Sequence, residues 1–173
     1  MKFLQFLENL LKKWGVREPE SRHIAMAEAL VFSDNPSARA GFPGNITLER
    51  CYGSLRKLSA ETAPGIAAVN CPGTTELPQW GVKITCAPAE KGLRPVGTVV
   101  VRSRLPGDEM RLPGGTKTLK KLFIDRKLPA DRRPFIPVVA DAEGVLAAEG
   151  IGINLDRLGD TPSVCITFLK KEN

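Results

Sequence analysis

The chain has 173 residues, of which 42% are apolar and 25% charged, so it is long enough for one or two globular domains and too apolar to be disordered. Its 16 glycines and 14 prolines argue against a plain helical bundle and favour turns and short strands. No apolar run approaches the ~20 residues of a membrane-spanning helix. Gln5 and Glu8 interrupt the one stretch that resembles a signal peptide, so we expect a cytoplasmic protein with no membrane partner.

The residues that usually carry enzyme chemistry are scarce. The chain has a single histidine, His23, and a single tyrosine, Tyr52, which argues against a self-contained acid–base or metal enzyme. The four cysteines form no C-x-x-C pair; they are Cys51, Cys71, Cys86 and Cys165. This spacing favours reduced, mostly buried thiols, with disulfides and metal ligation as the alternatives.

Helical periodicity dominates the start of the chain. Apolar residues at helical spacing predict a helix over residues 2–14, and a second helix opens at Pro19 and ends near Ser33. A loop follows, and residues 45–59 are typical of a β-hairpin with its turn at Tyr52-Gly53. The two helices share an apolar face that needs a partner. We expect His23 to serve packing or to lie at the surface rather than to catalyse.

The middle of the chain is rich in turns. Residues 60–80 have short extended pieces, residues 82–86 alternate as a strand, and residues 88–95 have the composition of a linker. We therefore predict two domains. Residues 1–93 would hold the helical pair and a first β-containing domain, and residues 94–173 a second, basic domain.

The second half alternates strands and turns. We predict a strand at 98–104, a return strand at 110–112 and a helix from Thr116 to Lys127. Four further strands are expected at 136–141, 144–148, 151–154 and 163–169, with a loop at 155–162. The fold class is α+β: an N-terminal helical pair, a middle β-containing region, and a C-terminal small sheet or half-open barrel with one basic helix.

Positive charge is concentrated in one segment. The whole chain has a net charge of +6, and residues 102–133 alone hold ten basic and four acidic residues, a difference that is also +6. Residues 134–173 hold three basic and six acidic residues, so their net charge is −3. A local basic block with an acidic flank is typical of a surface that meets a polyanion, although a solvated face that aids solubility has the same pattern.

The predicted basic helix should direct its lysines outward. On a helical wheel Leu119, Leu122 and Phe123 form one buried stripe, and the lysines fall away from it. Ile124 falls on the lysine face, and the pattern offers no account of it. Aromatic residues are few in this half, which favours recognition of phosphates and A-form shape over stacking of unpaired bases.

The segment before the helix has two interpretations. Backbone N–H groups of the turn at residues 113–117 (PGGTK) can approach a phosphate, although the spacing is not that of a Walker A loop and the glycines also suit a plain tight turn. A small enzyme that uses this turn as a nucleotide loop stays a remote alternative. Arg102 and Arg104 share one face of their strand and can align with Arg111 as phosphate ligands. Pairing with nearby acidic residues is the alternative for these arginines.

Several motifs of the second half resemble a known family. They are Arg104-Leu-Pro-Gly-Asp108, Arg111-Leu-Pro-Gly-Gly-Thr-Lys117, Leu119-Lys-Lys-Leu-Phe-Ile-Asp-Arg126, Arg132-Arg133 and Ile136-Pro-Val138. They resemble the C-terminal domain of bacterial tRNA(Ile)-lysidine synthetase, and Phe42-Pro-Gly-Asn45 through Tyr52 is similar, more loosely, to the middle region of that family. The likeness covers most of the chain.

The resemblance implies a function. The family is an ATP-dependent tRNA-modifying ligase that attaches lysine to the wobble cytidine of tRNA(Ile). Its N-terminal catalytic domain carries a Ser-Gly-Gly-x-Asp-Ser loop that this sequence lacks. We therefore expect an inactive fragment with no catalytic residue and no bound cofactor or metal, because ATP and Mg would belong to the missing domain. Its partners would be tRNA and the catalytic domain of its own full-length protein, and a homodimer stays open.

The resemblance also implies a set of residues that position tRNA through its backbone. They are Arg102, Arg104, Arg111, Lys117, Lys120, Lys121, Arg126, Lys127, Arg132 and Arg133. The alternative interpretation of the same cations is a basic protein-interaction module without RNA specificity, which would bind an acidic protein.

Overall fold

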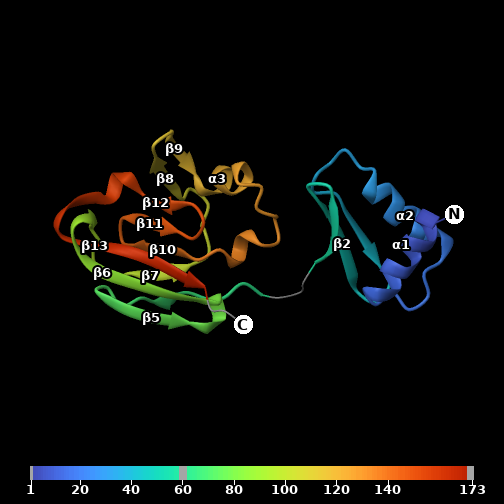
Figure 1. Cartoon of the computed structure of the whole chain (residues 1–173), viewed down its shortest axis with the longest axis horizontal. Helices are drawn as coiled ribbons and strands as arrows, with labels where there is room; N and C mark the ends of the chain where they lie inside the picture. The colour runs from blue at the N-terminus through green and yellow to red at the C-terminus, as the bar shows by residue number, and fades with distance from the viewer. Residues whose placement is uncertain (1, 59–61, 171–173) are drawn as a thin grey trace. The chain divides into compact units, whose positions relative to one another are not determined.

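The computed structural model describes residues 2–58 and 62–170, and the chain forms two compact units (Figure 1). Unit 1 is Met1–Glu61 and unit 2 is Thr62–Asn173. The boundary predicted between residues 93 and 94 instead falls inside unit 2. The reason is that the strand before it continues through the supposed linker to Leu93 and pairs with the C-terminal strand.

Unit 1 packs two helices on a small sheet. The helices are α1 (Lys2–Lys13) and α2 (Ser21–Val31), and the antiparallel strands, in the order β1-β2-β3, are Arg39–Phe42, Ile46–Cys51 and Ser54–Lys57. Leu7 and Leu11 of α1, Leu30 of α2, and Ile46 and Leu48 of β2 form its core. Both predicted helices and the predicted hairpin are present. Strand β1 lies in the segment that was expected to be a loop. The sequence did not reveal it because its glycine and the flanking prolines hide the strand pattern.

Two buried polar side chains fix the geometry of unit 1. The Nδ1 atom of His23 accepts the backbone N–H of Glu20 at 3.0 Å and so caps the start of α2. Glu49 is 1% exposed and lies between arginines of the two neighbouring strands, with its Oε1 atom 2.8 Å from Nη2 of Arg39 and its Oε2 atom against Arg56. His23 is therefore a packing and capping residue.

The described residues of unit 2 form three antiparallel sheets. The five-stranded sheet has the order β12 (Gly152–Ile153), β11 (Gly144–Ala148), β10 (Val138–Asp141), β7 (Val100–Arg102) and β4 (Ala67–Ala68). The three-stranded sheet has the order β13 (Leu158–Lys170), β6 (Val82–Leu93) and β5 (Gly73–Leu77). The remaining pair is the hairpin β8 (Glu109–Leu112) and β9 (Gly115–Thr118), and it leads directly into α3 (Leu119–Asp125). Short 3-10 turns lie at Pro78–Trp80, Arg133–Phe135 and Leu155–Arg157.

The five-stranded sheet is covered on both faces. Val139 and Leu146 point to one face, where they meet residues of the three-stranded sheet such as Ile84. Val138 and Val145 point to the other face, where they meet the β8–β9 hairpin and α3 in a second core that contains Phe123. Successive residues of a strand point to opposite faces, so a run of valines on β10 serves both cores at once. Unit 2 therefore has three layers, with α3 and the hairpin on one outer side (Figure 1).

The structure confirms the α+β class and corrects some element bounds. The basic helix begins at Leu119, because Thr116 to Thr118 pair with β8 as a strand. The C-terminal strand begins at Leu158 and so takes up most of the predicted loop at 155–162.

The cysteines are all free thiols, and the expectation that most of them are buried is wrong. Cys86 is buried, Cys51 and Cys71 are half-buried, and Cys165 is exposed. Burial raises the pKa of the Cys86 thiol to about 12, and contact with Cys71 adds to the rise. Among the described residues, no helix has the length and apolar character to cross a membrane.

A glycine is required at position 92, where β6 lies unusually close to the backbone of β13. A Cβ atom at this position would lie 2.5 Å from the carbonyl oxygen of Val164, which is backbone and cannot rotate away. We expect Gly92→Ala to lower the free energy of unfolding by about 1–3 kcal/mol through overpacking. Chemical denaturation measures the change. Gly114→Ala, in a turn with open space around it, is the control and should stay within about 0.5 kcal/mol of the parent; equal losses for both variants would contradict the steric explanation.

Candidate nucleic-acid interface

The β8–β9 hairpin and α3 position most of the predicted cations. Helix α3 begins directly after β9, and the Thr118 side chain caps it by accepting the N–H of Lys121 at 3.3 Å. Leu119, Leu122 and Phe123 are buried as the helical wheel predicts, so the opposite side of α3 faces solvent. The PGGTK turn does not lie at the start of α3 as the sequence suggested, because it joins β8 to β9, and strand β9 separates it from Leu119.

Hydrogen bonds join the segments that flank α3. The N–H of Leu119 donates to the carbonyl of Asp108 at 2.8 Å, which ties the loop after β7 to the start of α3. The Ser103 hydroxyl donates to the carbonyl of Pro134 at 2.6 Å, which ties the same loop to the segment after α3. The loop at 103–108, helix α3 and the loop at 126–135 therefore belong to one layer of unit 2.

The side chain of Arg102 has a structural role in unit 2. Its Nη1 and Nη2 atoms bond Oδ2 and Oδ1 of Asp108 at 2.7 and 2.9 Å, and the two side chains are only 11% and 10% exposed. Asp108 also accepts the N–H of Leu105 at 2.6 Å. The pair closes the Leu-Pro-Gly turn, which is the alternative that the sequence leaves open for this arginine. Arg133 has a similar local role, because its Nε atom donates to the carbonyl of Leu128 at 2.9 Å.

Two further cations form ion pairs at the surface. Nη1 of Arg111 lies 3.3 Å from Oδ1 of Asp156, and Nζ of Lys117 lies 2.9 Å from Oδ2 of Asp125. The hydrogen bond from Lys117 and the charges of Lys117 and Lys121 lower the pKa of the Asp125 carboxyl. All four paired side chains are between 39% and 61% exposed, so water and salt screen these pairs and leave the cations available to another anion.

Six predicted cations make no hydrogen bond or salt bridge through their side chains with any other described residue. They are Arg104, Lys120, Lys121, Arg126, Lys127 and Arg132, and we call them the free cations. Arg104 is half-buried and the other five are exposed. Exposed ammonium and guanidinium groups without internal partners can bind phosphate oxygens without first breaking an ion pair. Ile124 is 43% exposed on the same side of α3.

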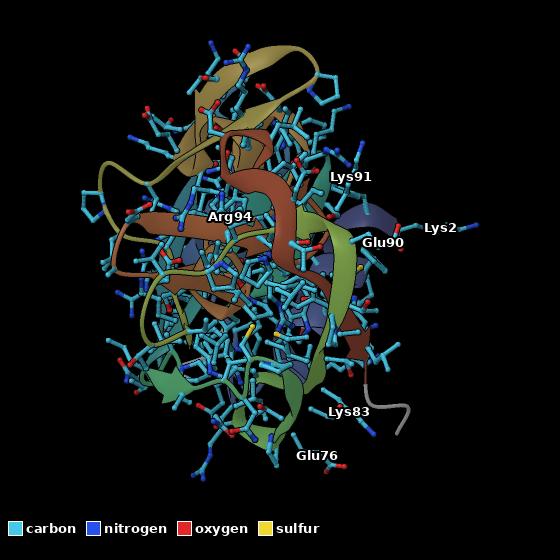
Figure 2. The ribbon with its side chains drawn as sticks, turned by 90° about the vertical axis from the view of Figure 1, so that its left-hand side faces the viewer. Lys2, Glu76, Lys83, Glu90, Lys91 and Arg94 are labelled. Carbon is cyan, nitrogen blue, oxygen red and sulfur yellow. The ribbon has the colours of Figure 1, made fainter. Side chains whose placement is uncertain are left out.

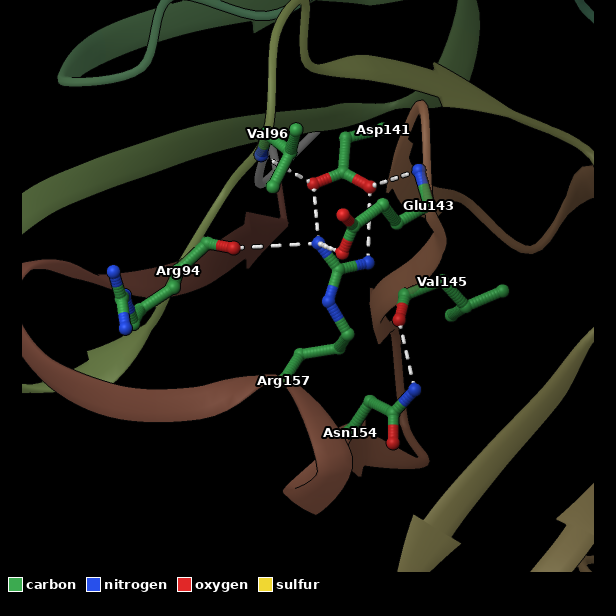
Figure 3. A network of polar contacts seen from close by, with 7 residues as sticks. All are labelled: Arg94, Val96, Asp141, Glu143, Val145, Asn154 and Arg157. Carbon is green, nitrogen blue, oxygen red and sulfur yellow. Dashed lines mark hydrogen bonds and ion pairs between the residues drawn. The ribbon is translucent and has the colours of Figure 1, made fainter.

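A buried arginine–aspartate network lies elsewhere in unit 2, and sequence reasoning missed it (Figure 3). Arg157 donates from Nη1 and Nη2 to both oxygens of Asp141, at 2.9 and 2.6 Å. The backbone N–H groups of Val96 and Glu143 donate to the same carboxylate at 2.7 and 2.9 Å. The Asp141 and Arg157 side chains are 0% and 11% exposed. The sequence gave no signal for this pair, because Asp141 and Arg157 are well separated in the chain and neither belongs to a recognisable local pattern.

The network joins β10 of the five-stranded sheet to the segments next to β6 and β13. Burial would raise the pKa of Asp141, but the hydrogen bonds from Arg157, Val96 and Glu143 outweigh it and hold this pKa below its ordinary value. Arg157 also donates to the carbonyl of Arg94 at 3.3 Å, which ties the start of β13 to the end of β6. No group of three or more potential metal-binding side chains gathers within the described residues.

Comparison with known proteins places unit 2 in a family. Residues 99–166, which include the hairpin, α3 and all strands of the five-stranded sheet except β4, match the family model described as the TilS substrate C-terminal domain. Residues 99–166 therefore belong to this domain family. The family recognised from the sequence motifs is thereby confirmed.

Individual relatives extend the match over both units. The chain is 33% identical over 135 residues to the tRNA(Ile)-lysidine synthase of Exiguobacterium sibiricum, covering 68% of this chain and 30% of the relative. It is 28% identical over 159 residues to the Bacillus cereus protein of that name, covering 82% and 33%. A short match of 46% over 50 residues to the Clostridioides difficile protein covers 29% and 11%. The chain thus spans a third or less of the length of these relatives.

A solved structure titled "Crystal structure of TILS C-terminal domain" aligns with a TM-score of 0.49 at 23% identity, over 62% of this chain and 98% of that one.

Removal of the Asp141 charge should destabilise unit 2. Asp141→Asn keeps the shape but leaves Arg157 buried without a counter-charge, and we expect a loss of about 3–5 kcal/mol at pH 7 by chemical denaturation. The folded-state pKa of Asp141 is lowered, so its contribution is present above the unfolded-state pKa and disappears as the pH falls through the folded-state value. The difference between parent and variant should therefore shrink below about pH 4. Asp160→Asn, at an exposed position of β13, should behave like the parent; a deficit independent of pH would contradict the electrostatic account.

Proposed function

We propose that unit 2 binds folded tRNA by its phosphate backbone, through the free cations. The observation that carries the proposal is that the side chains of six cations between residues 104 and 132 make no hydrogen bond or salt bridge with another described residue, while Arg102 is held by Asp108. Arg111 and Lys117 would join them, because an RNA phosphate can replace the exposed carboxylates of Asp156 and Asp125. Arg102 and Arg133 would act by holding the loops that carry their neighbours.

The chemistry of this surface suits phosphate and helical shape rather than bases. The aromatic residues of unit 2 are buried or half-buried, so the surface offers no exposed ring for stacking. A-form RNA presents its phosphates and 2′-hydroxyls across a shallow minor groove, and proteins recognise it mainly through these groups. Contacts of this kind position an RNA without reading its sequence.

The wider role that we propose is that of the tRNA-positioning part of a lysidine-forming ligase. The relatives carry the name tRNA(Ile)-lysidine synthase and are about three times longer than the matched region. In the proposed reaction, ATP activates the wobble cytidine of tRNA(Ile) and lysine then displaces AMP, in the cytoplasm. A catalytic domain outside this chain would bind ATP and Mg²⁺ and carry out both steps, and no residue of this chain is proposed as catalytic. A homodimer remains compatible with this role.

Loss of two free cations should weaken tRNA binding. For Lys120→Gln combined with Lys121→Gln we expect a roughly tenfold weaker Kd for tRNA, since each removes a charged hydrogen-bond donor to phosphate. The slope of log K against log salt should become shallower by roughly 1 for each phosphate that the variant no longer neutralises. Fluorescence anisotropy with labelled tRNA, at several salt concentrations, measures both quantities.

The matched control removes two lysines from another part of unit 2. Lys83 and Lys91 lie on β6, in the three-stranded sheet that covers the face of the five-stranded sheet opposite to α3. Figure 2 shows Lys83 at the far end of unit 2 from the β8–β9 hairpin. Lys83→Gln combined with Lys91→Gln changes the net charge by the same amount and should leave Kd within about twofold. Equal weakening by both pairs would reduce the interface to a general charge effect. Tighter binding to an acidic protein than to tRNA would favour the protein-interaction alternative, for which the exposed Ile124 would provide an apolar contact.

A further inference from the structure

The exposed aromatic side chains gather in unit 1, whereas the free cations belong to unit 2. Phe3 is 40% exposed, Phe6 58%, Phe32 69% and Tyr52 45%. The rings of Phe3 and Phe32 lie 5.8 Å apart between α1 and the end of α2. Single-stranded RNA is usually held by exposed aromatic rings together with a cation, and the described part of unit 2 lacks such rings. The two units therefore present different chemistry to an RNA.

Two of these aromatics, Phe3 and Phe6, border a cavity of unit 1. It has a volume of about 320 Å³ and opens between α1 and the β2–β3 hairpin. Its walls include Phe3, Phe6, Leu10 and Trp14 of the first helical segment and Leu55 of β3. The size falls at the lower end of the range of small-ligand sites, and the lining is mostly apolar and aromatic as in such sites. We call this the aromatic cavity.

One cation lines the aromatic cavity. Arg50 lies directly opposite Leu55 in the β2–β3 register, and both line the cavity. Its guanidinium is half-buried and makes no hydrogen bond or salt bridge with any described residue, unlike that of Arg39 on the next strand, which holds Glu49. Gly53 of the hairpin turn and Ser54 complete this rim. A free guanidinium beside aromatic walls is complementary to a ligand that joins a flat ring to an anion.

We propose that the aromatic cavity binds one unpaired nucleotide of an RNA, with its base against Phe3 and Phe6 and its phosphate at Arg50. This proposal rests on the proposed RNA-binding function and adds a second contact with different chemistry. Unit 2 would hold the backbone of paired RNA, and unit 1 would hold a nucleotide that is not paired. Stacking on aromatic side chains tolerates any base, so the site would detect an unpaired nucleotide rather than a sequence.

The test uses a single-stranded oligoadenylate of four nucleotides as the probe, on the whole chain. Anisotropy of the labelled oligonucleotide measures binding, and quenching of tryptophan fluorescence locates it, because Trp14 lines the cavity and Trp80 is buried in unit 2. We expect saturable binding with quenching, and a loss of affinity of about tenfold for Phe6→Ala and for Arg50→Met. Leu4→Ala, exposed on the same helix but outside this cavity, should bind like the parent. Trp14→Phe should abolish the quenching.

The outcomes separate this proposal from the function proposed for unit 2. The Lys120→Gln, Lys121→Gln pair should weaken binding of tRNA while leaving binding of the oligoadenylate unchanged. The inference is overturned if the oligoadenylate binds without quenching, or if Phe6→Ala and Arg50→Met bind it as the parent does. AMP that binds as tightly as the oligonucleotide would assign the cavity to a free nucleotide and also overturn it. A dimer in sedimentation that Phe6→Ala dissociates would assign the cavity to a second copy of the chain. Failure of tRNA to bind, with the oligoadenylate still bound, would count against the unit 2 proposal alone.

Discussion

The burial of the five-stranded sheet on both faces is the constraint on which the rest of unit 2 depends. Val138 and Val139 are successive residues of β10, and each is fully buried in a different core. One core needs the three-stranded sheet as a cover, and the other needs α3 with its hairpin. Helix α3 can satisfy that need with only Leu119, Leu122 and Phe123, so the rest of its short surface is free to carry charge. The cationic surface is thus a by-product of how the second core is closed.

The arginines of unit 2 differ in whether a carboxylate holds them. Arg102 and Arg157 lie almost entirely inside, each held in a two-point contact with one aspartate. A buried guanidinium without a carboxylate would be strongly unfavourable, so these pairs cannot be opened for a ligand at low free-energy cost. Arg104, two residues from Arg102, has no such partner. Basic residues that cluster in sequence therefore do not form a single structural set: the buried pairs hold the loops, and the cations without such a partner are the ones that we propose bind RNA.

Sequence alone predicted the local elements well and the long-range ones poorly. The helices of unit 1, the β2–β3 hairpin and the buried stripe of α3 follow from periodicity and turn residues that lie close together in the chain. The extension of β6 to Leu93 depends on pairing with β13, whose residues are more than sixty positions away, so its Pro88 and Gly92 looked like a linker. The Asp141–Arg157 pair likewise depends on tertiary structure. The contact of Arg102 with Asp108 is local, but the sequence left it open whether Arg102 or Arg104 would make it. The motifs identified the family, but the three-dimensional structure was needed to tell which cations are held by hydrogen bonds or salt bridges and which are not.

For the proposed binding of RNA, the contact between Lys117 and Asp125 would affect selectivity. An aspartate placed among lysines acts as a resident anion, so any phosphate that reaches Lys117 must compete with a carboxylate 2.9 Å away. At Lys120 and Arg132 a phosphate would meet no carboxylate paired in this way among the described residues. A flexible polyanion would gain little binding free energy at Lys117. An RNA whose neighbouring phosphates are already bound could displace Asp125 at a small additional cost in free energy. A negative charge inside a positive surface would in this way favour ligands with fixed phosphate spacing over flexible ones.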